Sequence, residues 1–223
     1  DGVVAIATLA SSNPSSETAS KLADALCALA TDDAMRGTLI QQGGFRSAVN
    51  LANNDKNDDR CRLSAAHAAG KVLITTDPRK LTDDQQLCAI RPLLWACRHV
   101  KATDLAVFEQ LLALTNLLSL GATARRRVAV EKGIHALEYL QFSDHPEVKR
   151  AATEALCNMV PDRSMIKHLS RSDKMKLWLA LCHDGVENDA RLASASIGCL
   201  AMACSDVDVA RAVAANNGAS TLI

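Results

Sequence analysis

The sequence predicts an all-α protein, a right-handed solenoid superhelix built from about five stacked helical repeats. The composition favours helices, because Gly (10) and Pro (5) are scarce among the 223 residues and aromatic residues make up only 3%. One helical pattern also recurs along the chain at a nearly constant interval. Each copy of that pattern follows two shorter helical segments, so the repeating unit has three helices.

The recurring helix is best aligned on the pattern small–Leu–x–Asn–Leu. We call the position of its Asn the ladder position, and the residues that occupy it are Ala28, Lys71, Asn116, Asn158 and Met202. The intervals between them are 43, 45, 42 and 44 residues. A period of ~43 residues with three helices per unit is typical of armadillo-type repeats. An ordinary helical bundle is the less favoured alternative.

The repeats follow one another without a linker. A first repeat without its first helix covers residues 1–31, four full repeats cover 32–76, 77–120, 121–161 and 162–205, and a sixth begins at 206–223. Glycines such as Gly44 and Gly133 open second helices, where we expect them to permit a left-handed turn. Pro146 suits the first turn of a third helix, and Pro161 stops that helix.

The two ends of the chain fall inside repeats. An array needs polar terminal repeats to cover its inner apolar faces. We therefore expect the sequence to be a fragment of a longer array, and expect self-association through the uncovered ends of the solenoid.

The charge balance excludes several classes of function. Lys and Arg together number 25, as do Asp and Glu, so bulk charge does not drive binding to nucleic acid or to a membrane surface. No apolar run approaches the ~18 residues of a membrane span, and the opening segment lacks the basic region of a signal peptide. The eight cysteines form no CxxC pair. We expect buried free thiols in the cytosol or nucleus, with the cytoplasm as the leading assignment.

Motifs for catalysis are absent from the sequence. It contains no phosphate-binding glycine loop, no HExxH and no GxSxG, and no Cys/His pair has metal-ligand spacing. We therefore predict no enzyme activity, no cofactor and no metal. The basic run Arg125–Arg127 is either a solvated face, the favoured interpretation, or a contact for an acidic partner.

Six consecutive segments resemble the UCS domain of the myosin-directed co-chaperone family. They read TTDPRK, AIRPLLWACRH, FEQLLALTNLLSL, VAVEKGIHALEYLQFSDHPEVKRAATEALCNMV, DKMKLWLALCHDG and ASASIGCLAMAC. The resemblance covers residues 65–204 and is most specific in FEQLLALTNL and KRAATEALCNMV. It implies that 65–223 correspond to the N-terminal part of that domain, and 1–64 to the central repeats before it, in one continuous solenoid.

The resemblance implies a chaperone or co-chaperone that binds the myosin motor domain in a concave groove and assists its folding or stability. Family members typically dock Hsp90 through an N-terminal tetratricopeptide module. The chain contains no such 34-residue repeat, so Hsp90 binding would use a module outside it.

The alternative function is an armadillo adaptor or scaffold that binds an extended peptide of another partner. Nuclear-import receptors of this type resemble one another in pairing a Trp with the ladder Asn, four residues before it. None of the corresponding positions holds a Trp; they are Asp24, His67, Leu112, Glu154 and Gly198. The sequence therefore disfavours the import type.

The candidate binding residues lie on the groove-facing side of the third helices. Positions four and seven or eight before a ladder residue share its face. The set comprises Asn116, Asn158, Glu109, Leu112, Phe108, Glu154, Arg150, Lys71, His67 and Met202. An Asn amide both donates and accepts, so it can clamp an extended peptide backbone. Lys71 and Met202 cannot, so we expect selectivity to centre on the third and fourth repeats.

Structural roles for the same side chains stay open at this point. A ladder Asn inside a helix can instead hydrogen-bond the backbone of the neighbouring repeat and fix the stacking. Glu109 and Glu154 can lie on a solvated face. For His67, a packing role is the favoured interpretation.

Overall fold

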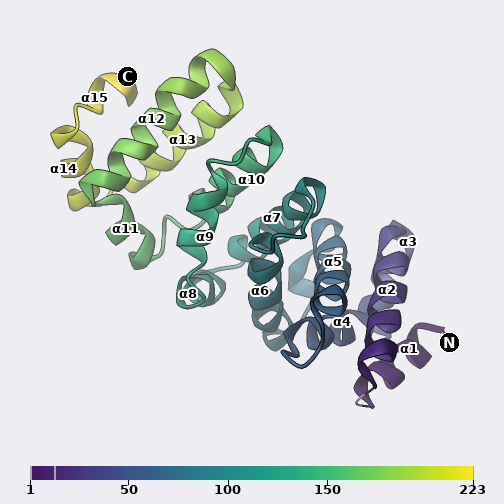
Figure 1. Ribbon diagram of the computed structural model, residues 1–223. Coiled ribbons are helices and arrows are strands. Elements are labelled where there is room, and N and C mark those ends of the chain that lie inside the picture. Colours follow the sequence, from purple (N-terminus) through teal and green to yellow (C-terminus); the bar gives the residue numbers. More distant parts are fainter. Residues whose placement is uncertain (1, 13, 223) are drawn as a thin grey trace. The chain divides into compact units, whose positions relative to one another are not determined.

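The computed structural model describes residues 2–12 and 14–222, without the side chains of 184–188 and 221–222. The described residues form helices and contain no strand, which confirms the all-α prediction (Figure 1). The chain divides into two compact units, Asp1–Glu131 and Lys132–Ile223. Position 64 lies inside a helix of the first unit, and the assignment of 1–64 and 65–223 to two regions stays a prediction.

The helices of the first unit follow the predicted repeats. They are α1 (Gly2–Ser11), α2 (Ser16–Thr31), α3 (Asp33–Gln41), α4 (Gly44–Asn53), α5 (Asp59–Thr75), η1 (Pro78–Lys80), α6 (Asp83–Cys97), α7 (Asp104–Ser119) and α8 (Ala122–Val130). The first helix of the third repeat is a single 3-10 turn, η1. The Asp77 side chain caps this turn by accepting from Arg79 N, and Pro78 begins it.

The second unit continues the same order of elements. Its helices are α9 (Gly133–Leu140), α10 (Pro146–Cys157), α11 (Arg163–Leu169), α12 (Ser172–Asn188), α13 (Ala190–Ala203), α14 (Val207–Ala215) and α15 (Ala219–Leu222). Pro146 begins α10, as predicted. The helix ends at Cys157, so Asn158 is its C-cap and not an interior residue as expected.

Third helices stack on third helices within each unit. In the first unit α2 packs against α5 and α5 against α7, while α1, α4 and α6 form a second row behind them. In the second unit α10 packs against α13. Small residues on α5, including Ala65 and Ala69, are fully buried and let the neighbouring helices approach closely. This stacking confirms the α-solenoid class.

Polar side chains set the starts of the helices. The residues that accept a hydrogen bond from a backbone N–H in the first turn include Ser15, Asp32, Asp58, Thr82, Thr103, Asp162, Asp189 and Asp206. Each such bond satisfies a donor that has no partner inside its helix.

The glycines that open second helices have a different role from the one expected. The left-handed position is the residue before them, and it is occupied by Gly43 (φ 83°), Lys132 (φ 57°) and Asn217 (φ 56°). Gly44 is needed for packing, because a Cβ at Gly44 would lie 2.6 Å from a methyl carbon of Leu39.

Candidate functional site

Three of the predicted groove residues form one charged cluster in the first unit. His67 and Lys71 lie one turn apart on α5, and Glu109 lies on α7. The Lys71 Nζ is 3.1 Å from Glu109 Oε1, and the His67 Nε2 is 3.7 Å from Glu109 Oε2. The Lys71 and Glu109 side chains are 17% and 18% exposed, so the ion pair is partly desolvated and ties two third helices together.

Burial controls the electrostatics of this cluster. It lowers the pKa of His67, with the Lys71 charge acting in the same direction against the Glu109 carboxylate. The imidazole is therefore neutral near pH 7. On α2, burial raises the pKa of the Cys27 thiol, which the Lys71 charge partly offsets. The Lys71 charge thus acts on groups of three successive third helices.

The ladder residue Asn116 faces the preceding repeat. Its Nδ2 donates to the Leu73 carbonyl at 2.9 Å and to the Ile74 carbonyl at 3.1 Å. Both carbonyls belong to the last turn of α5, where no intrahelical donor reaches them. The donor side of this amide therefore supports repeat stacking, which is the structural role left open above. Phe108 and Leu112, on the same helix, are half-buried and supply apolar surface.

Two of the four candidate residues of the second unit, Glu154 and Met202, are exposed. Arg150 is half-buried; its Nε lies 3.0 Å from Asp189 Oδ2 and its Nη2 lies 2.8 Å from Glu147 Oε1. Because Asp189 caps α13, this bridge joins α10 to the next third helix. Glu154 is exposed, Asn158 is half-buried, and the Met202 side chain at the ladder position of α13 is 54% exposed.

The basic run at Arg125–Arg127 is partly engaged within the chain. Arg125 Nη1 donates to the Leu118 carbonyl at 3.3 Å, and Arg127 Nη2 lies 2.8 Å from Glu131 Oε1. Arg126 is exposed. All eight cysteines are free thiols, but only four are buried as predicted. Cys88 is exposed, and three are half-buried: Cys27, Cys157 and Cys204.

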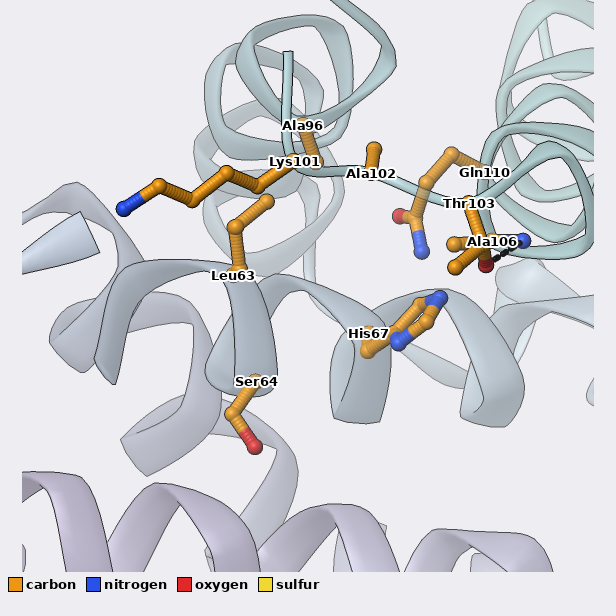
Figure 2. Close-up of a pocket in the computed structure, with 9 residues that line it drawn as sticks. All are labelled: Leu63, Ser64, His67, Ala96, Lys101, Ala102, Thr103, Ala106 and Gln110. Atoms are coloured by element: carbon orange, nitrogen blue, oxygen red, sulfur yellow. Dashed lines mark hydrogen bonds between the residues drawn. The ribbon is translucent and has the colours of Figure 1, made fainter. Parts of the chain in front are cut away.

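Sequence reasoning missed a mainly apolar cavity beside the charged cluster. It has a volume of about 120 Å³ and lies between α5, the end of α6 and the start of α7 (Figure 2). Gln110 lines it and is 1% exposed, yet neither its Oε1 nor its Nε2 has a hydrogen-bond partner in the described part of the chain. The available signal was a glutamine in the apolar stripe that runs from Ala106 through Leu114 on α7.

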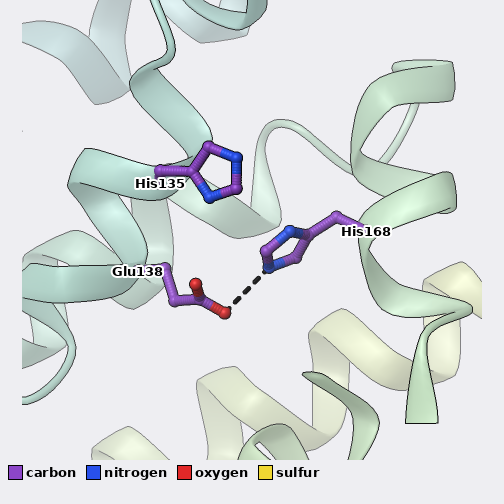
Figure 3. Close-up of side chains that lie close together, drawn as sticks. All are labelled: His135, Glu138 and His168. Atoms are coloured by element: carbon purple, nitrogen blue, oxygen red, sulfur yellow. Dashed lines mark hydrogen bonds and ion pairs between the residues drawn. The ribbon is translucent and has the colours of Figure 1, made fainter. Parts of the chain in front are cut away.

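A second missed cluster lies in the second unit, where Glu138 is 8% exposed (Figure 3). The His168 Nε2 lies 2.9 Å from Glu138 Oε1, and the Lys174 Nζ lies 2.7 Å from Oε2. The His135 ring packs edge-on against His168. Burial raises the pKa of Glu138, but hydrogen bonds and charges from His168 and Lys174 outweigh burial and hold the pKa below its usual value.

The Glu138 cluster places possible metal ligands of His135, Glu138 and His168 within 4.8 Å of one another. The Lys174 ammonium already neutralises the carboxylate, and its charge opposes a cation at the same oxygens. We therefore assign the cluster to holding α9 against α11 and α12. No helix among the described residues is long and apolar enough to span a membrane.

Comparison with known proteins shows which repeat proteins this chain is similar to. No protein-family model matches the chain. The protein unc-45 homolog B of Danio rerio is 31% identical over 192 residues, which are 83% of this chain and 20% of that relative. The solved structure of UNC-45 from Drosophila melanogaster is 30% identical with a TM-score of 0.86, covering 96% of this chain and 27% of the other.

A further solved structure comes from work on features of the UNC-45 chaperone critical for binding and folding muscle myosin. It is 25% identical with a TM-score of 0.81 and covers 96% of this chain and 24% of the other. The chain spans about a fifth of the length of the curated relatives it matches. Sequence and structure agree with the resemblance seen in the segments above: over most of its length the chain is homologous to UNC-45 proteins and has the structure of their armadillo-repeat region.

Proposed function

We propose that this chain is the client-binding repeat region of a UNC-45-type chaperone, which holds a segment of the myosin motor domain and assists its folding or stability. The proposal assigns the chain no enzyme activity and places it in the cytoplasm. Docking of Hsp90 is assigned to a module outside these 223 residues. The observation that carries the proposal is homology to a chaperone described as binding and folding muscle myosin.

The proposed contact surface in the first unit is the row of third helices α2, α5 and α7. The cluster of Lys71, Glu109 and His67 lies on this row beside the half-buried side chains of Phe108 and Leu112. Such a mixture of a paired charge and apolar surface suits an extended, partly folded segment. In the second unit the exposed Glu154 and Met202, with Asn158 and Arg150, are the proposed contacts.

The test measures how the chain affects a purified myosin motor domain. The chain in molar excess should reduce the light scattering of the motor domain on heating, and a tagged chain should retain the motor in a pulldown. A double variant, Lys71→Glu with Glu109→Lys, keeps an ion pair between α5 and α7 but exchanges the positions of the positive and negative charges. It should remain folded and bind the motor at least about fivefold more weakly, as loss of one good polar contact implies.

A matched control exchanges a pair away from the third helices. The double exchange Arg127→Glu with Glu131→Arg reverses the 2.8 Å pair at the end of α8 and should leave motor binding unchanged. If the wild-type chain neither retains the motor nor reduces its aggregation, the proposed function is wrong. If both exchanges leave binding unchanged while the wild type binds, the Lys71–Glu109 pair is a stacking element and not a contact.

A further inference from the structure

The Gln110 cavity combines a mainly apolar lining with one buried carboxamide. Gln110 is only 1% exposed, and its carboxamide carries one acceptor oxygen and two donor hydrogens. Figure 2 shows this carboxamide reaching from α7 into the space above His67. His67 lines the same cavity, and its Nε2 lies 3.7 Å from Glu109 Oε2, beyond hydrogen-bond distance. The two polar atoms of Gln110 are therefore the ones in this lining that have no partner within the described residues.

The fold makes room for this amide. A Cβ at Gly70 on α5 would lie 2.6 Å from Gln110 Nε2 and 2.7 Å from Oε1, so an alanine there would displace the carboxamide from this helix. Unsatisfied buried polar groups are destabilising and are rare in folded proteins. The carboxamide therefore takes its partner from outside the chain, either water or a polar group of a ligand that displaces the water.

The size and lining of the cavity restrict that partner. A volume of about 120 Å³ holds roughly four water molecules at ~30 Å³ each. One small side chain has about the same number of heavy atoms, so it could replace these waters. Ala96, Ala102 and Ala106 add an apolar wall. A partner must match an acceptor and donors at once, and a primary carboxamide does this by pairing its own N–H and C=O with those of Gln110.

We propose that this cavity binds the carboxamide of an Asn or Gln side chain from an extended segment of the client. The cavity lies between the adjacent third helices α5 and α7, and His67 belongs both to its lining and to the charged cluster. A segment that contacts Lys71 and Glu109 therefore lies next to His67, which lines the cavity. This inference rests on the proposed function and adds a specificity-determining pocket to the same surface.

The main test is Gln110→Met, which keeps the length and helix propensity of the side chain and removes its polar atoms. Because the amide has no partner in the unbound chain, the variant should unfold at the same urea concentration as the wild type or at a higher one. Its affinity for the motor domain should fall about tenfold. A second variant, Gly70→Ala, should weaken binding similarly by pushing the amide into the cavity.

The matched control is Gln141→Met in the second unit. Gln141 is also 1% exposed, but its Nε2 donates to Thr153 Oγ1 at 3.1 Å. This variant should lose stability and keep its motor affinity when measured where it remains folded. Equal motor affinity of the wild-type, Gln110→Met and Gly70→Ala chains would overturn the pocket assignment while leaving the proposed function intact.

A small-molecule probe tests the pocket without the motor domain, and so separates failure of the pocket assignment from failure of the proposed function. Acetamide should shift the Gln110 side-chain amide signals in ¹⁵N-labelled protein, whereas N,N-dimethylacetamide, which has no N–H, should not. If the wild-type chain fails to bind the motor but acetamide acts selectively, the proposed client is wrong and the pocket chemistry stands. If the motor does not bind and the two amides act alike, or neither acts, the pocket assignment is overturned as well.

Discussion

Substituting Asn116 by Ala should destabilise the stack of α5 and α7. The substitution removes the two hydrogen bonds from Nδ2 to the carbonyls of Leu73 and Ile74, at 2.9 and 3.1 Å. Leu73 is fully buried, so water does not readily replace the lost donor. Leaving one buried carbonyl unpaired costs about 1–3 kcal/mol, and we take about 2 kcal/mol for the variant.

Thermal unfolding followed by circular dichroism measures this loss. For a chain of this length a change of 1 kcal/mol shifts Tm by about 2–4 °C, so Asn116→Ala should lower Tm by roughly 4–8 °C. Asn116→Asp should lower it further, because a carboxylate then faces two carbonyl oxygens without a donor.

Motor binding provides the outcome that refutes this reasoning. The amide donors of Asn116 point toward α5. The motor affinity of Asn116→Ala, measured at a temperature where the variant and the wild type are both folded, should therefore differ from the wild-type affinity by less than about twofold. Loss of a hydrogen bond to the client would have a larger effect. If Asn116→Ala keeps the wild-type Tm and loses motor affinity, the amide serves the client and the stacking role is wrong.

Three further predictions concern stability and thiol chemistry. The exposed Cys88 should react with Ellman's reagent in the native chain, whereas burial raises the pKa of Cys97 to about 12 and should delay its reaction until unfolding; equal rates would contradict this. The pKa of Glu138 lies below its usual 4.5, because its ion-pair partners outweigh burial. Its contribution to stability should therefore be complete above about pH 4.5 and be lost as the pH falls through the folded pKa, so Glu138→Gln should cost less in urea titrations at acid pH than at pH 7. Gly44→Ala should destabilise by about 1–3 kcal/mol through overpacking, while Gly37→Ala, with open space at its Cβ, should stabilise by ~0.5–1 kcal/mol; the reverse order would refute the packing argument.

The repeat pattern allowed most of the fold to be predicted. Third helices carry an apolar pattern that must meet a neighbour on each side, so their spacing is visible in the sequence. The short η1 turn was not predictable from that pattern, because it depends on the local Asp77–Pro78 cap. The end of α10 before Asn158 was also missed, since periodicity alone does not fix the last turn of a helix.

The candidate site was predictable only in part. The i, i+4 relation places His67 and Lys71 on one face of α5 from sequence alone, but their contact with Glu109 depends on how α7 packs. The same limit applies to Glu138 and His168, which are 30 residues apart in sequence and meet through tertiary packing. Gln110 escaped notice because it occupies an apolar stripe, where a polar residue breaks the pattern without showing what it faces.

The polar groups of the first unit differ in how much hydrogen-bonding capacity and charge they leave for a client. Asn116 is bonded to α5, and the Lys71 and Glu109 charges neutralise each other, whereas Gln110 retains its full hydrogen-bonding capacity. Packed helices are about 8–10 Å apart, and an extended chain advances ~3.3 Å per residue, so a client crosses from one third helix to the next in about three residues. Only one of those side chains can enter the cavity between α5 and α7. A primary amide there would fix the register of the segment, while Phe108 and Leu112 would contact its neighbours with little selectivity.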